Sequence, residues 1–471
     1  MQQRTKIVAT IGPASRAHAT LARLVDAGMD VARLNLSHGT HDEHREVMHA
    51  VREIAEQKQQ PVAILLDLCG PKVRVGAIRE PSVTLVPGQE FTLTTRAVPG
   101  SERAVSVSHA TLPAEVQAGD PVLLSDGAIE LEVIATQATD IVCRVIVGGA
   151  LSSHKGLNLP TRTLQVQSLT DKDRRDLEFG ITHGVDFVAL SFVRSGADVQ
   201  CARQFLQQRR SSIPLIAKIE KHEALDHLDA IIALADGVMV ARGDLGVDVP
   251  LERVPRLQKE LIARANRAAK PVITATQMLR SMVDNPRPTR AEVTDVANAI
   301  LDGTDAVMLS EETAAGRYPA DAVAIMARIA AATEASFPYS RSALDPGAAV
   351  TPPEAVAHAA CRLADEVGAA AIVTFTQSGS TARLVAGHRP RQMVIALTPV
   401  AAVHRQLALS FGVLPLLAAP MRDTDDMIEK AFAMVAGTGL VQPGERVVIT
   451  AGVPVGVPGT TNLIKVAELS R

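Results

Sequence analysis

Two short segments of the chain end in charged side chains that could act together on an anionic substrate. The first ends in Lys218-Ile-Glu220 and the second in Arg242-Gly-Asp244, and both follow apolar runs of strand length. On neighbouring strands, the Glu220 and Asp244 carboxylates would offer hard oxygen ligands to Mg²⁺ or Mn²⁺ and leave positions open for a substrate. Lys218 would be a fixed cation aimed at the same space.

Further residues suit the binding of an anion. Arg33 can clamp a phosphate through two hydrogen bonds, and Gly243 opens a loop or helix whose free N–H groups can hold a carboxylate or phosphate. A metal, a lysine and an arginine around one anion favour phosphoryl transfer or enolate stabilisation. The chain has no GxxxxGKS or GxxxxGKT motif, so a nucleotide would be held in another way.

Each signal has a structural alternative. A Lys-x-Glu sequence is commonly a surface ion pair, Arg-Gly-Asp is commonly a turn, and Asp67 at the end of another apolar run can cap a helix. An active site is favoured because polar groups stand at most of the segment ends, including Thr276-Gln277 and Ser310-Glu311-Glu312.

The elements that would position these residues are eight apolar runs of strand length. They are Lys6–Ile11, Asp30–Asn35, Val62–Asp67, Asp186–Ser191, Leu215–Glu220, Gly237–Arg242, Val272–Gln277 and Ala306–Ser310. Helical stretches separate most of them, and Thr40 with Glu43 and Thr289 with Glu292 match capping boxes. This pattern predicts an α/β fold, a (β/α)8 TIM barrel, whose chemistry gathers at the carboxyl ends of its strands.

Other patterns interrupt and follow this series. Short alternating runs with Gly, Pro and Asp turns fill residues 73–163 and predict an inserted small β-barrel lid domain. The barrel would comprise residues 1–72 and 164–340. After a Ser-, Ala-, Pro- and Gly-rich linker, four strands and three helices predict a C-terminal α/β domain over residues 341–471.

Composition limits the class of protein. Hydrophobic residues make up 47% of the 471 residues, and 48 basic against 51 acidic side chains give a net charge of −3. The chain lacks the basic excess typical of proteins that bind nucleic acid or an anionic membrane. Its four cysteines are far apart, and it has no uninterrupted apolar run of about 18 residues. We expect a cytoplasmic enzyme with no nucleic acid or membrane partner.

At these same positions the sequence resembles the pyruvate kinase family. Lys6–Ser15 matches the family's opening strand and loop, and Gly28–Gly39 matches its GMxVARxNxSHG segment. Further long motifs match in order at Ile216–Glu220, Met239–Gly246, Lys270–Leu279 and Pro286–Asn298. The resemblance covers essentially the whole chain. It implies a barrel with an inserted lid and a C-terminal domain, and transfer of phosphate from phosphoenolpyruvate to ADP, giving pyruvate and ATP.

The resemblance also implies roles for the residues at the strand ends. Glu220 and Asp244 would bind the divalent metal, Mg²⁺ or Mn²⁺. Lys218 would stabilise charge on the phosphoryl group and on the enolate, and Arg33 would hold the phosphate. Lys218, Arg33 and Thr276 would be the catalytic residues.

The remaining roles concern the substrate carboxylate and the nucleotide. The Gly243 and Asp244 amides with Thr276 would hold the carboxylate, and Thr276 would lie on the route that protonates the enolate carbon. Closure of the lid would exclude water. The residues that would face ADP or ATP are Asn35, His38, Arg74 and Lys155.

One departure from the family pattern concerns K⁺. Many members have Thr-Lys-Gly-Pro-Glu after the third strand and need K⁺, whose ligands include an Asn, a Ser and an Asp. This sequence keeps Asn35, Ser37 and Asp67 but has Lys72 in place of the Glu. A lysine ammonium is a compact tethered cation. We therefore expect Lys72, near these residues, to replace K⁺; a solvent-facing Lys72 with K⁺ still bound is the alternative.

A regulatory site is expected in the C-terminal domain. A strand-to-helix turn there is a candidate phosphate nest, and in the family it holds an activating sugar phosphate. The facing loop, Gly452–Thr461, lacks the Trp-Arg pair of members that respond to fructose 1,6-bisphosphate, so a sugar monophosphate or AMP is expected. The alternative is that this turn is an ordinary helix cap. Separately, a homotetramer is expected because the family forms tetramers. The turn contains Thr376, Ser378, Gly379, Ser380 and Thr381.

Two other functions stay open at the level of sequence. One is another phosphoenolpyruvate or pyruvate barrel, such as a lyase or mutase, although those relatives need no ADP site and hence no lid with Lys155. The other is a non-catalytic sugar-phosphate sensor. Such a sensor would be expected to lose Lys218, Glu220 or Asp244, and all three are present.

Overall fold

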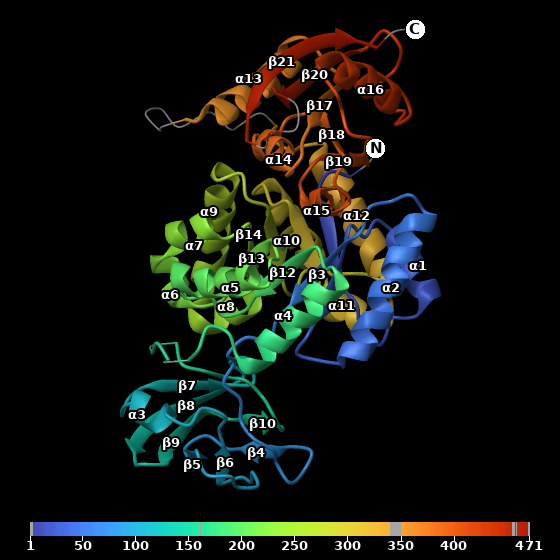
Figure 1. Cartoon of the computed structure of the whole chain (residues 1–471). Coiled ribbons are helices and arrows are strands. Elements are labelled where there is room, and N and C mark those ends of the chain that lie inside the picture. The colour runs from blue at the N-terminus through green and yellow to red at the C-terminus, as the bar shows by residue number, and fades with distance from the viewer. Residues whose placement is uncertain are drawn as a thin grey trace.

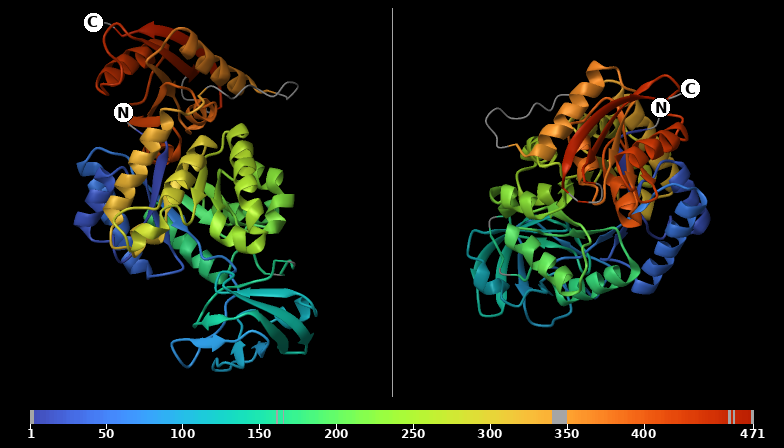
Figure 2. Two further views of the ribbon diagram at one scale, coloured as in Figure 1. Left: turned by 180° about the vertical axis from the view of Figure 1, so that it is seen from behind. Right: turned by 45° about the horizontal axis from the view of Figure 1, so that its top comes forward.

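The computed structural model describes residues 3–160, 162–164, 166–339, 350–454, 457 and 459–469. They form a central barrel with a lid at one end and a third domain at the other end, near the N-terminus (Figures 1 and 2). The chain passes directly from the third barrel strand into the lid. The lid therefore faces the carboxyl ends of the barrel strands.

Eight parallel strands close the barrel in the order β1, β16, β15, β14, β13, β12, β3, β2. Apolar side chains such as Leu65, Ile216 and Met239 fill its interior. All eight predicted strands are confirmed, each within two residues of its expected bounds. They are β1 (Lys6–Thr10), β2 (Val31–Asn35), β3 (Ala63–Asp67), β12 (Phe187–Leu190), β13 (Leu215–Ile219), β14 (Gly237–Ala241), β15 (Val272–Ala275) and β16 (Ala306–Leu309).

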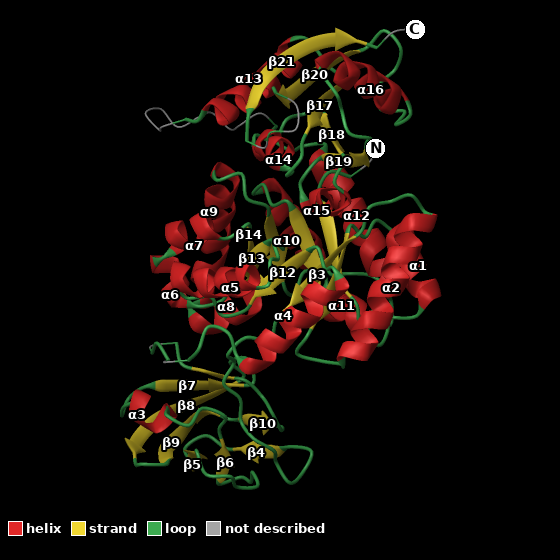
Figure 3. Ribbon diagram, viewed as in Figure 1, coloured by secondary structure: helices red, strands yellow, loops and turns green. Residues whose placement is uncertain are grey.

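Helices surround the barrel (Figure 3). Both predicted capping boxes are present, at Thr40 with Glu43 and at Thr289 with Glu292, and they satisfy N–H groups that the first helical turn leaves unpaired. The helices are α1 (His18–Asp26), α2 (His41–Gln57), α4 (Asp171–His183), α5 (Gly196–Gln208), α6 (His222–Asp226), α7 (Leu228–Leu234), α8 (Arg242–Asp248), η1 (Leu251–Arg253), α9 (Val254–Arg267), η2 (Arg280–Val283), α10 (Arg290–Leu301), α11 (Glu311–Ala314) and α12 (Pro319–Glu334).

The lid has its own apolar core and two sheets, with strand orders β11-β7-β8-β9-β5-β6 and β10-β4. The short alternating runs predict antiparallel pairing, but β5 and β6 are parallel because residues 95–103 return the chain to the start of β5. The elements are β4 (Val83–Leu85), β5 (Glu90–Thr94), β6 (Ala104–Ser106), α3 (Leu112–Glu115), β7 (Pro121–Leu124), β8 (Ile129–Thr136), β9 (Asp140–Val147), β10 (Gly149–Leu151) and β11 (Leu157–Asn158).

The C-terminal domain is a five-stranded sheet in the order β19-β18-β17-β20-β21 with helices packed on it. Its first four strands were predicted, whereas the edge strand β21 was not. The elements are α13 (Pro352–Glu366), β17 (Ala371–Phe375), α14 (Ser380–Gly387), β18 (Met393–Thr398), α15 (Ala401–Gln406), η3 (Leu407–Leu409), β19 (Val413–Leu417), α16 (Thr424–Ala436), β20 (Arg446–Gly452) and β21 (Thr461–Glu468). Among the described residues, no helix has both the length and the apolar character needed to span a membrane.

A buried ion pair joins the C-terminal domain to the barrel. The Arg389 guanidinium contacts both carboxylate oxygens of Asp305, at 3.1 and 2.8 Å, directly before β16. Asp305 also accepts hydrogen bonds from the backbone amides of Val272 and Phe411, each at 3.0 Å. One carboxylate thus ties two barrel strands to the third domain.

Candidate active site

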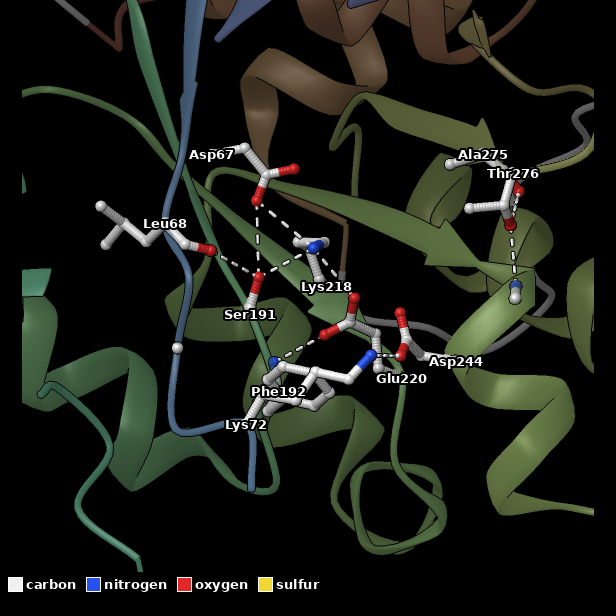
Figure 4. A network of polar contacts seen from close by, with 12 residues as sticks. Asp67, Leu68, Lys72, Ser191, Phe192, Lys218, Glu220, Asp244, Ala275 and Thr276 are labelled. Carbon is white, nitrogen blue, oxygen red and sulfur yellow. Dashed lines mark hydrogen bonds and ion pairs between the residues drawn. The ribbon is translucent and has the colours of Figure 1, made fainter. Parts of the chain in front are cut away.

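Asp67, the last residue of β3, is the centre of a buried ion cluster at the barrel mouth (Figure 4). Its Oδ2 accepts a hydrogen bond from Arg33 Nε at 2.7 Å, and its Oδ1 lies 3.3 Å from Lys218 Nζ. Burial alone would raise the pKa of Asp67, but the charges of Lys218 and Arg33 lower it below its ordinary value. The carboxylate therefore stays ionised and holds both cations in place.

Lys218, on β13, is enclosed by acceptors. Its Nζ donates to Ser191 Oγ at 2.8 Å and lies 2.9 Å from Glu220 Oε1. Burial would lower the pKa of Lys218, but Asp67 and Glu220 raise it above its ordinary value, so the side chain stays an ammonium. No role for Ser191 is predicted from the sequence, although its place at the end of a predicted strand is a signal that could identify it.

Glu220 follows β13 and is almost fully buried. Its Oε2 accepts a hydrogen bond from the Phe192 amide at 2.7 Å. Burial raises the pKa of Glu220, and the charge of Asp244 adds to this rise against the opposing charge of Lys218. Two carboxylates that repel each other, each with a lysine ammonium as counter-charge, form a donor set that fits a divalent cation.

Lys72 reaches the same mouth from the segment that leads into the lid. Its Nζ lies 2.8 Å from Asp244 Oδ1 and 3.4 Å from Asp126 Oδ1 of the lid. Burial would lower the pKa of Lys72, but Asp244 raises it above its ordinary value. Among the described residues, the carboxylates of Asp244 and Asp126 are the polar partners of the Lys72 ammonium.

The sequence predicts that Lys72 lies near Asn35, Ser37 and Asp67, and its two carboxylate contacts, Asp244 and Asp126, come from outside that set. The physical reason is that Arg33 and Lys218 already neutralise Asp67, whereas Asp244 carries a charge that the Lys72 ammonium can pair with. Asn35 Oδ1 instead accepts a hydrogen bond from the Ser37 amide at 3.1 Å.

Thr276 follows β15 in a left-handed backbone conformation, with φ of 70°. Its Oγ1 accepts a hydrogen bond from the Gly243 amide at 2.7 Å, so one amide expected to hold the substrate carboxylate is engaged by Thr276 (Figure 4). Arg242 fixes this turn, because it donates to the Thr276 carbonyl at 2.8 Å and pairs through two nitrogens with Asp295. This positioning role of Asp295 is not predicted from the sequence.

The four candidate nucleotide-binding residues lie along the route from barrel to lid. Asn35 is half-buried at the end of β2, and His38 is exposed just beyond it. Arg74 donates to the His154 carbonyl at 3.1 Å, next to the exposed Lys155. The structure therefore groups Arg74 with Lys155 in the lid, and Asn35 with His38 on the barrel.

The expected phosphate nest lies at the start of α14. A cavity there is lined by Thr376, Ser378, Ser380 and Thr381, and by Gly452 and Thr461 of the facing loop. Gly379 has a φ of 81°, which glycine adopts without strain, and Thr376 Oγ1 is buried with no hydrogen-bond partner among the described residues. Residues 455, 456 and 458 of the facing loop lie outside the described residues.

Fold and site together define a class: a barrel enzyme that handles an anionic substrate with lysine, arginine and paired carboxylates beneath a lid domain. Two family models match the chain, "Pyruvate kinase, barrel domain" over residues 2–323 and "Pyruvate kinase, alpha/beta domain" over residues 354–467. They favour neither the lyase nor the mutase alternative.

Similar whole proteins agree with the family models. The chain is 49% identical to pyruvate kinase 2 of Synechocystis sp. over 99% of this chain and 79% of that protein, and 44% identical to the pyruvate kinase of Thermotoga maritima over 99% of both. A crystal structure of a pyruvate kinase from Cryptosporidium parvum is similar, with a TM-score of 0.92, 39% identity, and coverage of 99% of this chain and 96% of that one.

The chain belongs to the pyruvate kinase family. Its reaction is the transfer of a phosphoryl group from phosphoenolpyruvate to ADP, which gives pyruvate and ATP.

Proposed function

We propose that the enzyme uses Mg²⁺ or Mn²⁺ held by Glu220 and Asp244. The observation that carries this proposal is the convergence of both carboxylates with Lys218 at one mouth, where each acid contacts a lysine ammonium at 2.8–2.9 Å. The bound metal would stabilise negative charge on the phosphoryl and enolate oxygens. Groups of this chain itself would bind and orient the substrate and supply the proton.

Arg33 and Lys218 would bind the phosphoryl oxygens. One of the five N–H donors of Arg33 is directed at Asp67 and another at Thr10 Oγ1, which leaves donors for a phosphate. Because Lys218 stays protonated, it can stabilise negative charge first on the phosphoryl group and then on the enolate. The Thr276 hydroxyl, with the Asp244 amide and with the Gly243 amide once it is released from Thr276 Oγ1, would orient the substrate carboxylate, and Thr276 would lie on the proton route to the enolate carbon.

For Lys72 we propose the role that K⁺ has in other members, so that K⁺ is not required. Its ammonium lies between a barrel carboxylate, Asp244, and a lid carboxylate, Asp126. A permanent single positive charge thus stands where the lid meets the mouth. The replacement would be electrostatic and would not need the contacts that Asn35 and Ser37 give to K⁺ elsewhere.

The remaining parts of the proposal concern the nucleotide and regulation. ADP would lie between Asn35 and His38 of the barrel and Arg74 and Lys155 of the lid, residues 73–163. A sugar monophosphate or AMP would bind at residues 376–381 of the C-terminal domain, residues 341–471, where the buried Thr376 hydroxyl, which has no partner in the part of the chain that the structure describes, supports a polar ligand. We also propose a homotetramer, as in the family.

The metal site is tested by Mn²⁺ binding, followed by electron paramagnetic resonance. We expect Glu220→Gln and Asp244→Asn each to weaken Mn²⁺ binding at least tenfold, because each removes a charged oxygen ligand. Glu311→Gln, at an exposed carboxylate on α11 just beyond β16, is the matched control. Wild-type Mn²⁺ affinity in both site variants would contradict the assignment.

A further inference from the structure

A cavity of about 530 Å³ opens between the amino ends of the barrel strands and the C-terminal domain. The barrel contributes Asp236 and Lys270, just before β14 and β15, and the C-terminal domain contributes Ser378, Ser380 and Arg383 around the start of α14. The elements that carry these residues, α14 and the starts of β14 and β15, lie at the end of the barrel opposite the lid (Figure 1), so the cavity is separate from the active site. Its volume is typical of small-molecule sites, about 300–1,000 Å³.

Positive charge exceeds negative charge around this cavity. Asp236 is already paired with Arg203, at 2.6 Å. Lys270 donates to a backbone carbonyl at 2.7 Å and Arg383 to another at 3.0 Å, and within the described residues neither forms an ion pair. Two cationic side chains, one from each domain, therefore line the cavity without a carboxylate of their own.

Burial makes this excess charge unfavourable. It lowers the pKa of both Lys270 and Arg383, and Asp236 offsets the effect only in part. An anion bound in the cavity would offset the repulsion between the positive charges of Lys270 and Arg383. The Ser212 and Ser410 hydroxyls, which line the same cavity, can donate further hydrogen bonds to its oxygens.

We propose that this cavity binds a small phosphate-bearing molecule, with Lys270 and Arg383 contacting its phosphate from the two domains. A planar guanidinium fork and a lysine point charge suit a tetrahedral dianion with several acceptor oxygens. The site is distinct from the cavity at Thr376–Thr381, because Lys270 and Arg383 line only the interdomain cavity of the two.

The two cavities share a wall. Ser378 and Ser380 line both of them, and Arg383 donates to the Ser378 carbonyl. An anion bound to Arg383 would therefore change the contact of Arg383 with the loop that lines the other cavity. It would also bridge the barrel and the C-terminal domain.

The location is tested with crystals of the full chain soaked in tungstate, an anomalous scatterer that mimics phosphate. We expect an anomalous peak between Lys270 and Arg383 in the wild type and its loss in Lys270→Gln crystals. Peaks confined to the barrel mouth and the Thr376–Thr381 cavity would overturn the proposal.

The affinity is tested in solution by calorimetric titration with orthophosphate. We expect Lys270→Gln and Arg383→Gln each to weaken one class of sites at least tenfold, while Lys465→Gln, at an exposed lysine of the same domain, leaves every class unchanged. Unchanged binding in both cavity variants would overturn the site. Malonate is the comparison anion, and malonate binding tighter than orthophosphate at the Lys270-dependent site would overturn the assignment to phosphate.

Discussion

Lys218 has a permanent charge and a fixed position, and the two properties have the same cause. Asp67, Ser191 and Glu220 surround its ammonium, which orients it and keeps it protonated. We predict that Lys218→Met lowers kcat at least about a thousandfold, because a preorganised charge is lost where negative charge develops.

Binding of phosphoenolpyruvate should survive in Lys218→Met, because Arg33 and the loop at Thr276 remain. The measurements are steady-state turnover and equilibrium binding of phosphoenolpyruvate, with Lys465→Met as the surface control. Turnover close to wild type would remove Lys218 from its assigned role.

At the scale of elements, the start of α10 depends on one carboxylate. Glu292 accepts hydrogen bonds from the Thr289 amide at 2.8 Å and the Ser281 amide at 2.7 Å, so it caps α10 and ties the preceding turn η2 to it. Burial would raise the pKa of Glu292, but these hydrogen bonds and those from the Ser281 and Thr289 hydroxyls lower it.

Because the folded-state pKa of Glu292 is lowered, its contribution to stability is complete above its unfolded pKa, near 4.5, and is lost as the pH falls through the lower folded value. We predict that Glu292→Gln lowers the free energy of unfolding by about 1–2 kcal/mol at pH 7 and by less at pH 3. Urea unfolding at both pH values measures this, and an equal loss at both would show that the charge is not responsible.

Strand prediction succeeded where apolar residues ran continuously, as in the barrel, or alternated regularly, as in β8 and β9 of the lid, and it missed β21, where neither pattern is clear. Barrel strands such as β13 are buried along their whole length, so their sequences are apolar runs with clear ends. The edge strand β21 has a mixed sequence, Thr461–Glu468, because it is largely exposed. Its apolar pattern is too weak to distinguish it from a loop.

Site prediction had a different limit. Strand ends located Arg33, Asp67, Lys218, Glu220 and Asp244, because a parallel barrel brings all such ends to one mouth. The partners of Lys72 depend on the path of the lid, since Asp126 is 54 residues further along the chain and lies in a different domain. Periodicity carries no information on such a contact.

At the scale of the whole molecule, the pair Arg389–Asp305 joins barrel and C-terminal domain. Both side chains are buried, so removal of one partner leaves an uncompensated charge. We predict that Arg389→Met lowers the free energy of unfolding by about 3–5 kcal/mol. Denaturant unfolding tests this against Arg446→Met, at an exposed arginine of the same domain, and a loss below that of the control would contradict it.

The central claim is that this chain transfers phosphate from phosphoenolpyruvate to ADP with Lys72 in place of K⁺. The most direct measurement is pyruvate formation from phosphoenolpyruvate and ADP with Mg²⁺ in a tetramethylammonium buffer free of K⁺, repeated with KCl at matched ionic strength. We predict the same turnover in both for the wild type, and a marked K⁺ dependence in Lys72→Glu. Activity of the wild type only with K⁺ would contradict the role of Lys72, and no activity in either buffer, with sugar phosphates added, would contradict catalysis itself.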